Sequence, residues 1–271
     1  MNLTGLMALP ASGLVLFLLI LVRASAIFLI APMLGHTQVP ARFKIGLAFF
    51  IALILTPLLL RDWPPLTLEN PWLLAAALFQ EMVLGVLIGF LVQLVFVAFQ
   101  FAGQIVGQQM GFGMANIMDP QTATQVSVIA QIYMIAGSLI YLTLDGHLWM
   151  LMALEKSLRI IPPGQYRFDG VSLSLLLDAT NELFWITVLL VAPVMGVLVL
   201  TELGMGIVAR IMPQMNIFVA SFPIKIGLGV LTLAVSLPIL IEHMAGLFEQ
   251  NFAGLLTFLR AVAAGVTNGG G

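Results

Sequence analysis

The sequence predicts an all-α membrane protein with about six long apolar helices. Apolar residues make up 61% of the 271 residues, whereas charged residues make up only 8%. Ordinary soluble domains carry about 25% charged residues. A soluble all-α fold is therefore disfavoured, because this chain lacks the charge that would cover its surface. The apolar residues also gather in runs of about 20, the length that crosses a bilayer as a helix.

The first three apolar runs are separated by proline and by charged residues. Arg23 is the only charge in the first run, and Pro32 lies near its end. Pro57 lies near the end of the second run, and a loop rich in charge and proline follows it. The third run is long and contains Glu81 early in its length. These features predict helices at residues 13–34, 43–60 and 72–101.

Three further runs follow a less apolar stretch, and a short amphipathic helix at 147–160 lies among them. Pro162-Pro163-Gly164 then breaks the chain, and the stretch 201–223 also reads as broken. We expect a single helical domain over residues 1–260 and a flexible tail over 261–271. The three predicted helices lie at 126–144, 173–200 and 224–241, the last extended by an amphipathic piece to residue 260.

Several functional classes are disfavoured by what the sequence lacks. The net charge is −2 and no basic block occurs, so we expect no nucleic-acid partner. Cysteine is absent, which excludes disulfides and thiolate metal sites. His36, His147 and His243 are isolated from one another and do not have metal-ligand spacing. No nucleotide fingerprint or catalytic motif is present. We therefore predict a protein that is not an enzyme and that has no cofactor and no metal.

Glycines recur at four-residue spacing within and just after the third run. Gly85 and Gly89 form one pair, and Gly103, Gly107 and Gly111 form a longer row. Such faces let helix backbones approach closely in membranes. Ordinary helix packing is the favoured interpretation of this pattern.

The segment 110–120 is the most unusual in the chain. It contains two glycines and three methionines, and it ends in Asp119-Pro120. Glycine weakens a helix, and the residue before a proline avoids helical geometry. Irregular backbone at membrane depth is tolerated where it is buried in protein or lines a cavity, and methionine fits irregular gaps. The segment is suited to sealing a pore, and the alternative is an ordinary surface loop.

Some ionisable residues interrupt the apolar runs. A charge at the centre of a membrane helix is costly, so we expect Arg23 to pair with a carboxylate or with backbone carbonyls, in this chain or in another subunit. Asp178 and Glu182 are four residues apart and so share a helix face. They form part of a proton path, or they lie near a helix start, where the helix dipole favours acids.

Four segments carry motifs in a fixed order: RASAIFLIAPMLGHTQVPARFKIGLA, GQQMGFGMANIMDPQ, DGHLW and RIMPQMNIFVASFPIKIGLG. From about residue 12 to residue 258, the chain resembles the FliR family of type III export-gate subunits. The residues that match the family motifs outside the central segment, and that the resemblance marks as structural or intersubunit residues, are Arg23, Pro32, Pro40, Arg42, Lys44, Gly146, His147, Arg210, Pro213, Gln214, Asn216, Phe218, Phe222 and Pro223.

The resemblance implies a fold of bent helical hairpins, with a FliP-like part followed by a FliQ-like part. It implies a subunit of the flagellar protein export gate, in the bacterial inner membrane at the flagellar basal body. The implied partners are FliP-like and FliQ-like gate subunits, FlhB-like and FlhA-like export components, and the unfolded proteins that are exported.

In the family that the chain resembles, a central loop acts as the plug of the closed gate. By matching position, that role falls on Met110, Gly111, Phe112, Gly113, Met114, Ala115, Asn116, Ile117, Met118, Asp119 and Pro120. Phe112, Met114, Ile117 and Met118 would block the channel by apolar packing, and Gly111 and Gly113 would let the loop swing aside.

Two other functions remain open on the sequence. An independent proton-coupled secondary transporter of about six helices would use Asp178, Glu182 or Glu81 as proton carriers. A membrane anchor or scaffold without a pore would tolerate point changes in the segment 110–120.

Overall fold

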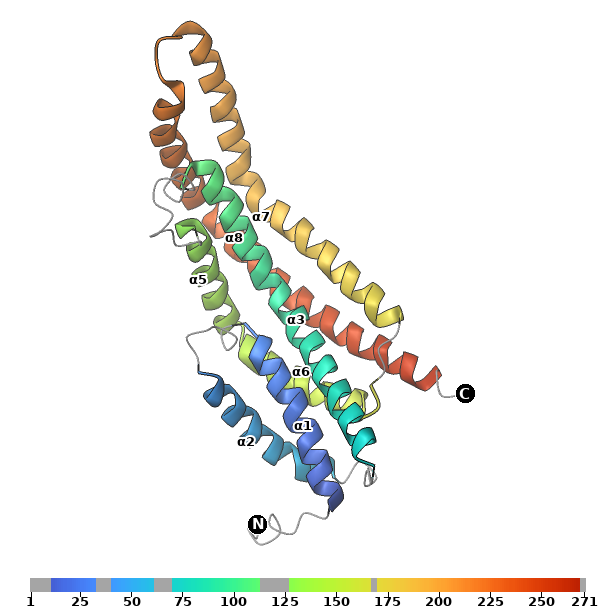
Figure 1. Cartoon of the computed structure of the whole chain (residues 1–271). Coiled ribbons are helices and arrows are strands. Elements are labelled where there is room, and N and C mark those ends of the chain that lie inside the picture. The colour runs from blue at the N-terminus through green and yellow to red at the C-terminus, as the bar shows by residue number, and fades with distance from the viewer. Residues whose placement is uncertain (1–10, 33–39, 61–69, 113–126, 167–169, 269–271) are drawn as a thin grey trace. The chain divides into compact units, whose positions relative to one another are not determined.

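The computed structural model describes residues 11–32, 40–60, 70–112, 127–166 and 170–268. Within these ranges all the regular structure is helical (Figure 1). The helices are α1 (Ala11–Ile30), α2 (Ala41–Leu59), α3 (Pro71–Met110), α5 (Val128–Thr143), α6 (Gly146–Ile160), α7 (Gly170–Ile211) and α8 (Ile217–Asn268). The predicted all-α class is therefore confirmed.

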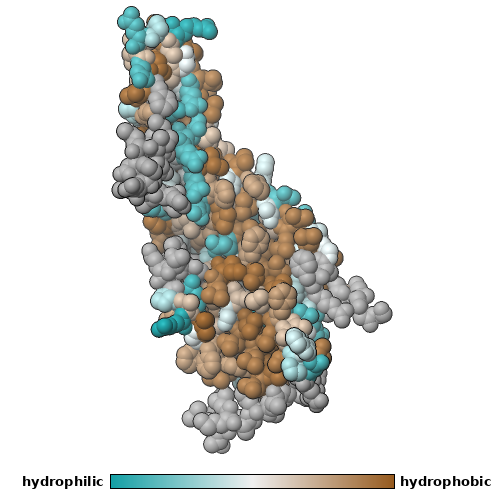
Figure 2. All heavy atoms as spheres, viewed as in Figure 1, coloured by the Kyte–Doolittle hydropathy of each residue, from teal (hydrophilic) through white to brown (hydrophobic). Residues whose placement is uncertain are grey.

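Five of these helices are long and apolar enough to cross a membrane: α1, α2, α3, α7 and α8. The pair α5 and α6, separated by a short break, makes a sixth candidate if it counts as one span. Apolar side chains cover most of the face seen in Figure 2, as a lipid or protein environment requires. The prediction of a membrane protein with about six such helices is confirmed.

Three helices are longer than the sequence predicts. Helix α3 continues past residue 101 to Met110, and α7 continues past residue 200 to Ile211. Helix α8 starts at Ile217 and runs through Pro223 and Pro238 to Asn268, past residue 260, where the flexible tail is predicted to begin. The broken stretch predicted at 201–223 is therefore wrong over most of its length. An internal proline removes one backbone hydrogen bond, and the neighbouring turns keep theirs.

The chain divides into two compact units. Unit 1 comprises Met1–Gln93, Gly146–Ala179 and Gln250–Gly271, and unit 2 comprises Leu94–Asp145 and Thr180–Glu249. Helices α3, α7 and α8 each contribute one part to each unit. A single helical domain over residues 1–260 stays a prediction.

In unit 1, α1 lies against α2 and α6. The rings of Phe17 and Phe49 meet edge to face with centroids 5.4 Å apart. The first part of α3 also approaches α1 closely, because a Cβ atom at Gly85 would lie 2.6 Å from the Arg23 carbonyl oxygen. The last part of α8 is held by Phe252, whose ring stacks on Trp149 with a centroid distance of 5.3 Å.

In unit 2, α5 lies against the second part of α3. A Cβ atom at Gly103 would come 2.4 Å from the Ala130 Cα atom, so the two backbones are nearly in contact. Ser127 caps α5, since its side chain accepts a hydrogen bond from the Ile129 amide. An aromatic cluster fills the space beyond Gly137. Its rings, with centroids 5.2–6.2 Å apart, belong to Phe96, Phe99, Tyr141 and Phe248.

The predicted role of the spaced glycines in helix packing is confirmed. Gly85 and Gly89 face α1, and a Cβ atom at Gly89 would meet Ile30 at 3.0 Å. Gly103 and Gly107 face the start of α5, where a Cβ atom at Gly107 would meet the Ser127 hydroxyl at 1.9 Å. At Gly85 and Gly103 the added Cβ atom would meet backbone at less than 3.0 Å, so only glycine permits the approach there.

Gly103→Ala is expected to lower the stability of unit 2, although alanine favours a helix by about 1 kcal/mol over glycine. Its methyl group meets backbone, which cannot rotate away, and such overpacking costs about 1–3 kcal/mol. Gly196→Ala is the matched control, because nothing lies within 4 Å of its added methyl group. The measurement is the thermal unfolding midpoint of the purified chain in detergent. Equal midpoints for the two variants would contradict the close contact.

Candidate functional site

A fully buried ion pair lies in unit 1 between α1 and α3. Arg23 and Glu81 both have side chains with 0% exposure. The Arg23 Nε atom lies 2.5 Å from Glu81 Oε2, and Nη2 lies 3.0 Å from Oε1. This two-point geometry is the strongest arrangement for a guanidinium and a carboxylate. The prediction that Arg23 pairs with a carboxylate is confirmed, and the partner belongs to the same chain.

The remaining polar groups of this pair bind α6 and the turn that follows it. Arg23 Nη1 donates to the Ser157 hydroxyl at 3.3 Å, and both Nη atoms donate to the Ile161 carbonyl at 3.2 Å. Glu81 Oε1 accepts a hydrogen bond of 2.8 Å from the Gly164 amide. A backbone carbonyl, the alternative partner expected for Arg23, is thus present beside the carboxylate. The pair thus holds α1, α3, α6 and residues 161–164 together.

Glycine is required at the turn that Glu81 binds. Gly164 has a φ angle of +78°, a conformation that other residues rarely adopt. Gln80, with its amide nitrogen turned toward the turn, donates to the Gly164 carbonyl at 3.1 Å and to the Tyr166 carbonyl at 3.2 Å. The predicted break at Pro162-Pro163-Gly164 is therefore an ordered turn that two neighbouring residues of α3 hold.

The start of the predicted plug lies at the end of α3. Gly111 has a φ angle of +97°, and its amide bonds to the Gln108 carbonyl at 3.0 Å. The Phe112 amide bonds to the Gly107 carbonyl at 3.0 Å. These two hydrogen bonds and the left-handed glycine form a Schellman motif, which ends a helix sharply. The other predicted plug residues, 113–120, lie outside the residues that the structure describes.

Two residues of this helix end are held by α8 within unit 2. Met110 is fully buried, and its side chain lies against the backbone of Gly229, where a Cβ atom would meet Met110 Cε at 2.7 Å. A Cβ atom at Gly111 would meet the Phe222 ring at 2.5 Å. Two motif positions far apart in sequence, Gly111 and Phe222, are thus brought into contact.

The motif residues near the N-terminus and around α6 lie on helices or at helix ends. Pro32 lies in the turn after α1, and Pro40 is the residue before α2. Lys44 is buried on α2, whereas Arg42 is exposed. Gly146 is buried at the start of α6, and His147 beside it is exposed.

The motif residues at the end of α7, in the turn after it and at the start of α8 are mostly exposed: Arg210, Pro213, Gln214, Asn216 and Pro223. The Asn216 side chain accepts a hydrogen bond of 3.3 Å from the Val219 amide, so it caps the start of α8. Pro223 lies inside α8, and the side chain of Phe218 lies outside the described residues. An intersubunit role for the exposed residues stays a prediction.

Asp178 and Glu182 on α7 are exposed, and they do not lie at a helix start. Helix α7 begins at Gly170 and has no acidic residue in its first turn, so Asp178 and Glu182 are beyond the reach of the helix dipole. That explanation of the two acids is wrong, because the helix starts earlier than predicted. Their role as proton carriers stays a prediction.

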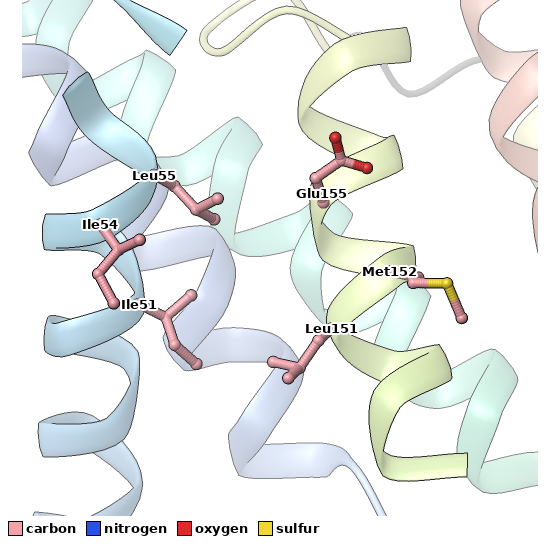
Figure 3. A pocket seen from close by; sticks show the side chains of 6 residues that line it. All are labelled: Ile51, Ile54, Leu55, Leu151, Met152 and Glu155. Carbon is pink, nitrogen blue, oxygen red and sulfur yellow. The ribbon is translucent and has the colours of Figure 1, made fainter. Parts of the chain in front are cut away.

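A hollow of about 370 Å³ lies between α2 and α6 in unit 1 (Figure 3). Leu151 points from α6 toward α2, and Ile51 and Leu55 point from α2 toward α6. Glu155, at its edge, is paired with Arg159 one turn along α6. The lining is aliphatic apart from this acid and Met152, so it has no cluster of groups suited to catalysis.

Residues 14–251 match the family described as bacterial export proteins, family 1. The chain is 33% identical over 242 residues to the flagellar biosynthetic protein FliR of Pectobacterium carotovorum subsp. carotovorum, covering 88% of this chain and 91% of the relative. It is 33% identical to the protein of the same name from Bacillus subtilis (strain 168), with 91% and 95% covered. For the protein of that name from Escherichia coli (strain K12), the identity is 31%, with 86% and 88% covered.

Removing one member of the buried pair is expected to destabilise unit 1 strongly. Glu81→Met leaves the Arg23 charge buried without its carboxylate, and such losses cost roughly 3–5 kcal/mol. The double variant Arg23→Met/Glu81→Met buries no charge and should be more stable than either single variant. The level of folded chain in membranes and the unfolding midpoint in detergent measure this. If the double variant loses as much stability as the two single variants lose together, Arg23 and Glu81 are not coupled.

Proposed function

Since the chain belongs to family 1 of the bacterial export proteins and to its FliR members, it is a subunit of the flagellar export gate in the inner membrane, and we propose that its segment 110–120 plugs the closed channel. The plug would block ions and water while no substrate passes. No catalytic step is part of this function. Energy for export would come from the proton-motive force and from other export components.

The observation that supports the plug is the fixed end of α3. A plug has to begin from a rigid point, because a loop that hangs from a frayed helix cannot keep its apolar side chains in a pore. Gly111 ends α3 at a defined residue, and Met110 beside it is fully buried. The segment that departs there carries Phe112, Met114, Ile117 and Met118. Such soft apolar side chains can repack around a passing chain and close again.

We further propose that the channel is formed together with FliP-like and FliQ-like subunits, and that FlhB-like and FlhA-like components act beside them. The exposed surface of α7 and α8 in unit 2 supports this proposal, because it has the features of a surface that other protein subunits cover. It displays large apolar side chains, among them Leu200, Ile207 and Val235, each more than 60% exposed. The Glu202 side chain in the same unit is 43% exposed, and a charge of this kind faces protein or water in membrane proteins.

Deleting residues 111–118 should raise the leakage of ions in cells that make the whole gate. A length-preserving variant, with serine at positions 112, 114, 117 and 118, should do the same because it removes the apolar seal. Asn116→Ser is the matched control, since it changes a polar residue of the same segment and should leave leakage as it is. Leakage that stays at the level of the intact gate in both test variants would rule out the plug.

The alternative of an independent proton-coupled transporter makes a different prediction about assembly. Its carriers would be Asp178, Glu182 or Glu81, and the engagement of Glu81 with Arg23 and Gly164 weighs against the last of these. A transporter would work as a monomer or homo-oligomer.

Gentle detergent extraction of the tagged chain should yield a large hetero-oligomer, because the exposed apolar surface of a gate subunit is covered by its partners. Native mass spectrometry of the intact assembly should find one copy of this chain with several FliP-like and FliQ-like subunits. A monomer or homodimer, from cells that also make those subunits, would favour the transporter.

A further inference from the structure

The end of α3 contacts an ion pair of unit 2, which joins Glu202 to Lys225. Glu202 lies on α7 and Lys225 lies on α8, in helices that are otherwise strongly apolar there. The Lys225 Nζ atom lies 2.5 Å from Glu202 Oε1. The Gln109 side-chain amide donates to the same oxygen at 3.0 Å. One carboxylate therefore joins three helices, and one of its partners is the residue next to Met110.

We propose that Glu202 is a positioning residue for the plug and that it latches the end of α3 onto the pair of helices α7 and α8. This inference rests on the proposed function of the segment 110–120. The latch has a polar half, Gln109–Glu202–Lys225, and an apolar half, in which Met110 lies against Gly229 and Gly111 against Phe222.

The two halves of the latch depend on one another. Lys225 precedes Gly229 by one helical turn on α8, so the two residues lie on the same face. Gln109 and Met110 are consecutive at the last turn of α3. The hydrogen bond between Gln109 and Glu202 therefore keeps Met110 opposite Gly229. The Met110 side chain fits there because Gly229 has no side chain. A shift of α3 by one residue would lose both contacts.

The charges make the latch selective for one arrangement. The Lys225 side chain is only 16% exposed, so most of it is removed from solvent and it needs an anionic partner. A fully exposed pair would contribute little, whereas a carboxylate that also accepts from Gln109 fixes both partners in one geometry. The latch therefore sets the point from which the segment 110–120 starts.

The test uses the absence of cysteine from the chain, which makes an introduced thiol unique within it. Met110→Cys reports on the latch, and Ala98→Cys, also fully buried on α3 in unit 2, is the control. Both are labelled with N-ethylmaleimide in membranes of cells that make the whole gate. Glu202→Lys places two lysines together and should raise labelling at position 110 by roughly five-fold or more, with position 98 unchanged.

Exchanging the two charges tests whether the pair itself is responsible. Glu202→Lys/Lys225→Glu should return labelling at position 110 to the original rate, because the ion pair is restored and the Gln109 amide can accept as well as donate. Unchanged labelling in Glu202→Lys, or no recovery in the exchanged variant, would overturn the latch. A parallel rise at positions 98 and 110 would also overturn it, because unit 2 would then loosen as a whole.

Ion leakage in the same cells separates the latch from the plug. Glu202→Lys should raise leakage, though less than deletion of residues 111–118, and the exchanged variant should restore it. Labelling that changes as expected while leakage does not would leave the latch standing and remove the plug.

Discussion

The Arg23–Glu81 ion pair is the interaction on which unit 1 depends. Both charges lie at 0% exposure among apolar helices, where neither is tolerable without the other. Their hydrogen bonds reach Ser157, Ile161 and Gly164, so α1, α3, α6 and the turn after α6 have to assemble together. Apolar packing alone tolerates sliding of one helix along another. The paired charges exclude it, because any other register buries a charge alone.

Glycine makes this pairing possible. Gly85, one turn beyond Glu81, lies directly against the Arg23 carbonyl, and a side chain there would push α3 away from α1. Unit 2 has the same kind of contact at Gly103 and Gly107, where α3 meets the start of α5. One long helix thus makes close backbone contacts in both units. This rigidity is what a loop at its end requires if the loop is to act from a fixed position.

The end of α3 connects the packing of the helices with the proposed plug. Its termination at Gly111 is local, since a left-handed glycine and two backbone hydrogen bonds produce it. Its location comes from tertiary contacts with Gly229, Phe222 and Glu202. The proposed plug needs both, because a seal that starts here has to return to one place after each substrate passes.

The sequence by itself determined the membrane class, the approximate helices and the need of Arg23 for a partner, because composition and the cost of a buried charge act locally. It did not determine where α7 and α8 begin and end, since a proline stops a helix only when packing does not support the next turn. Lys225 lies in a predicted apolar run and Glu202 lies just after another, but nothing in the sequence marks Gln109 as a neighbour of Glu202. Only the tertiary structure decided those contacts. Gln109 is 93 positions from Glu202 and Lys225 is 23 positions from it, and helix packing alone brings them together.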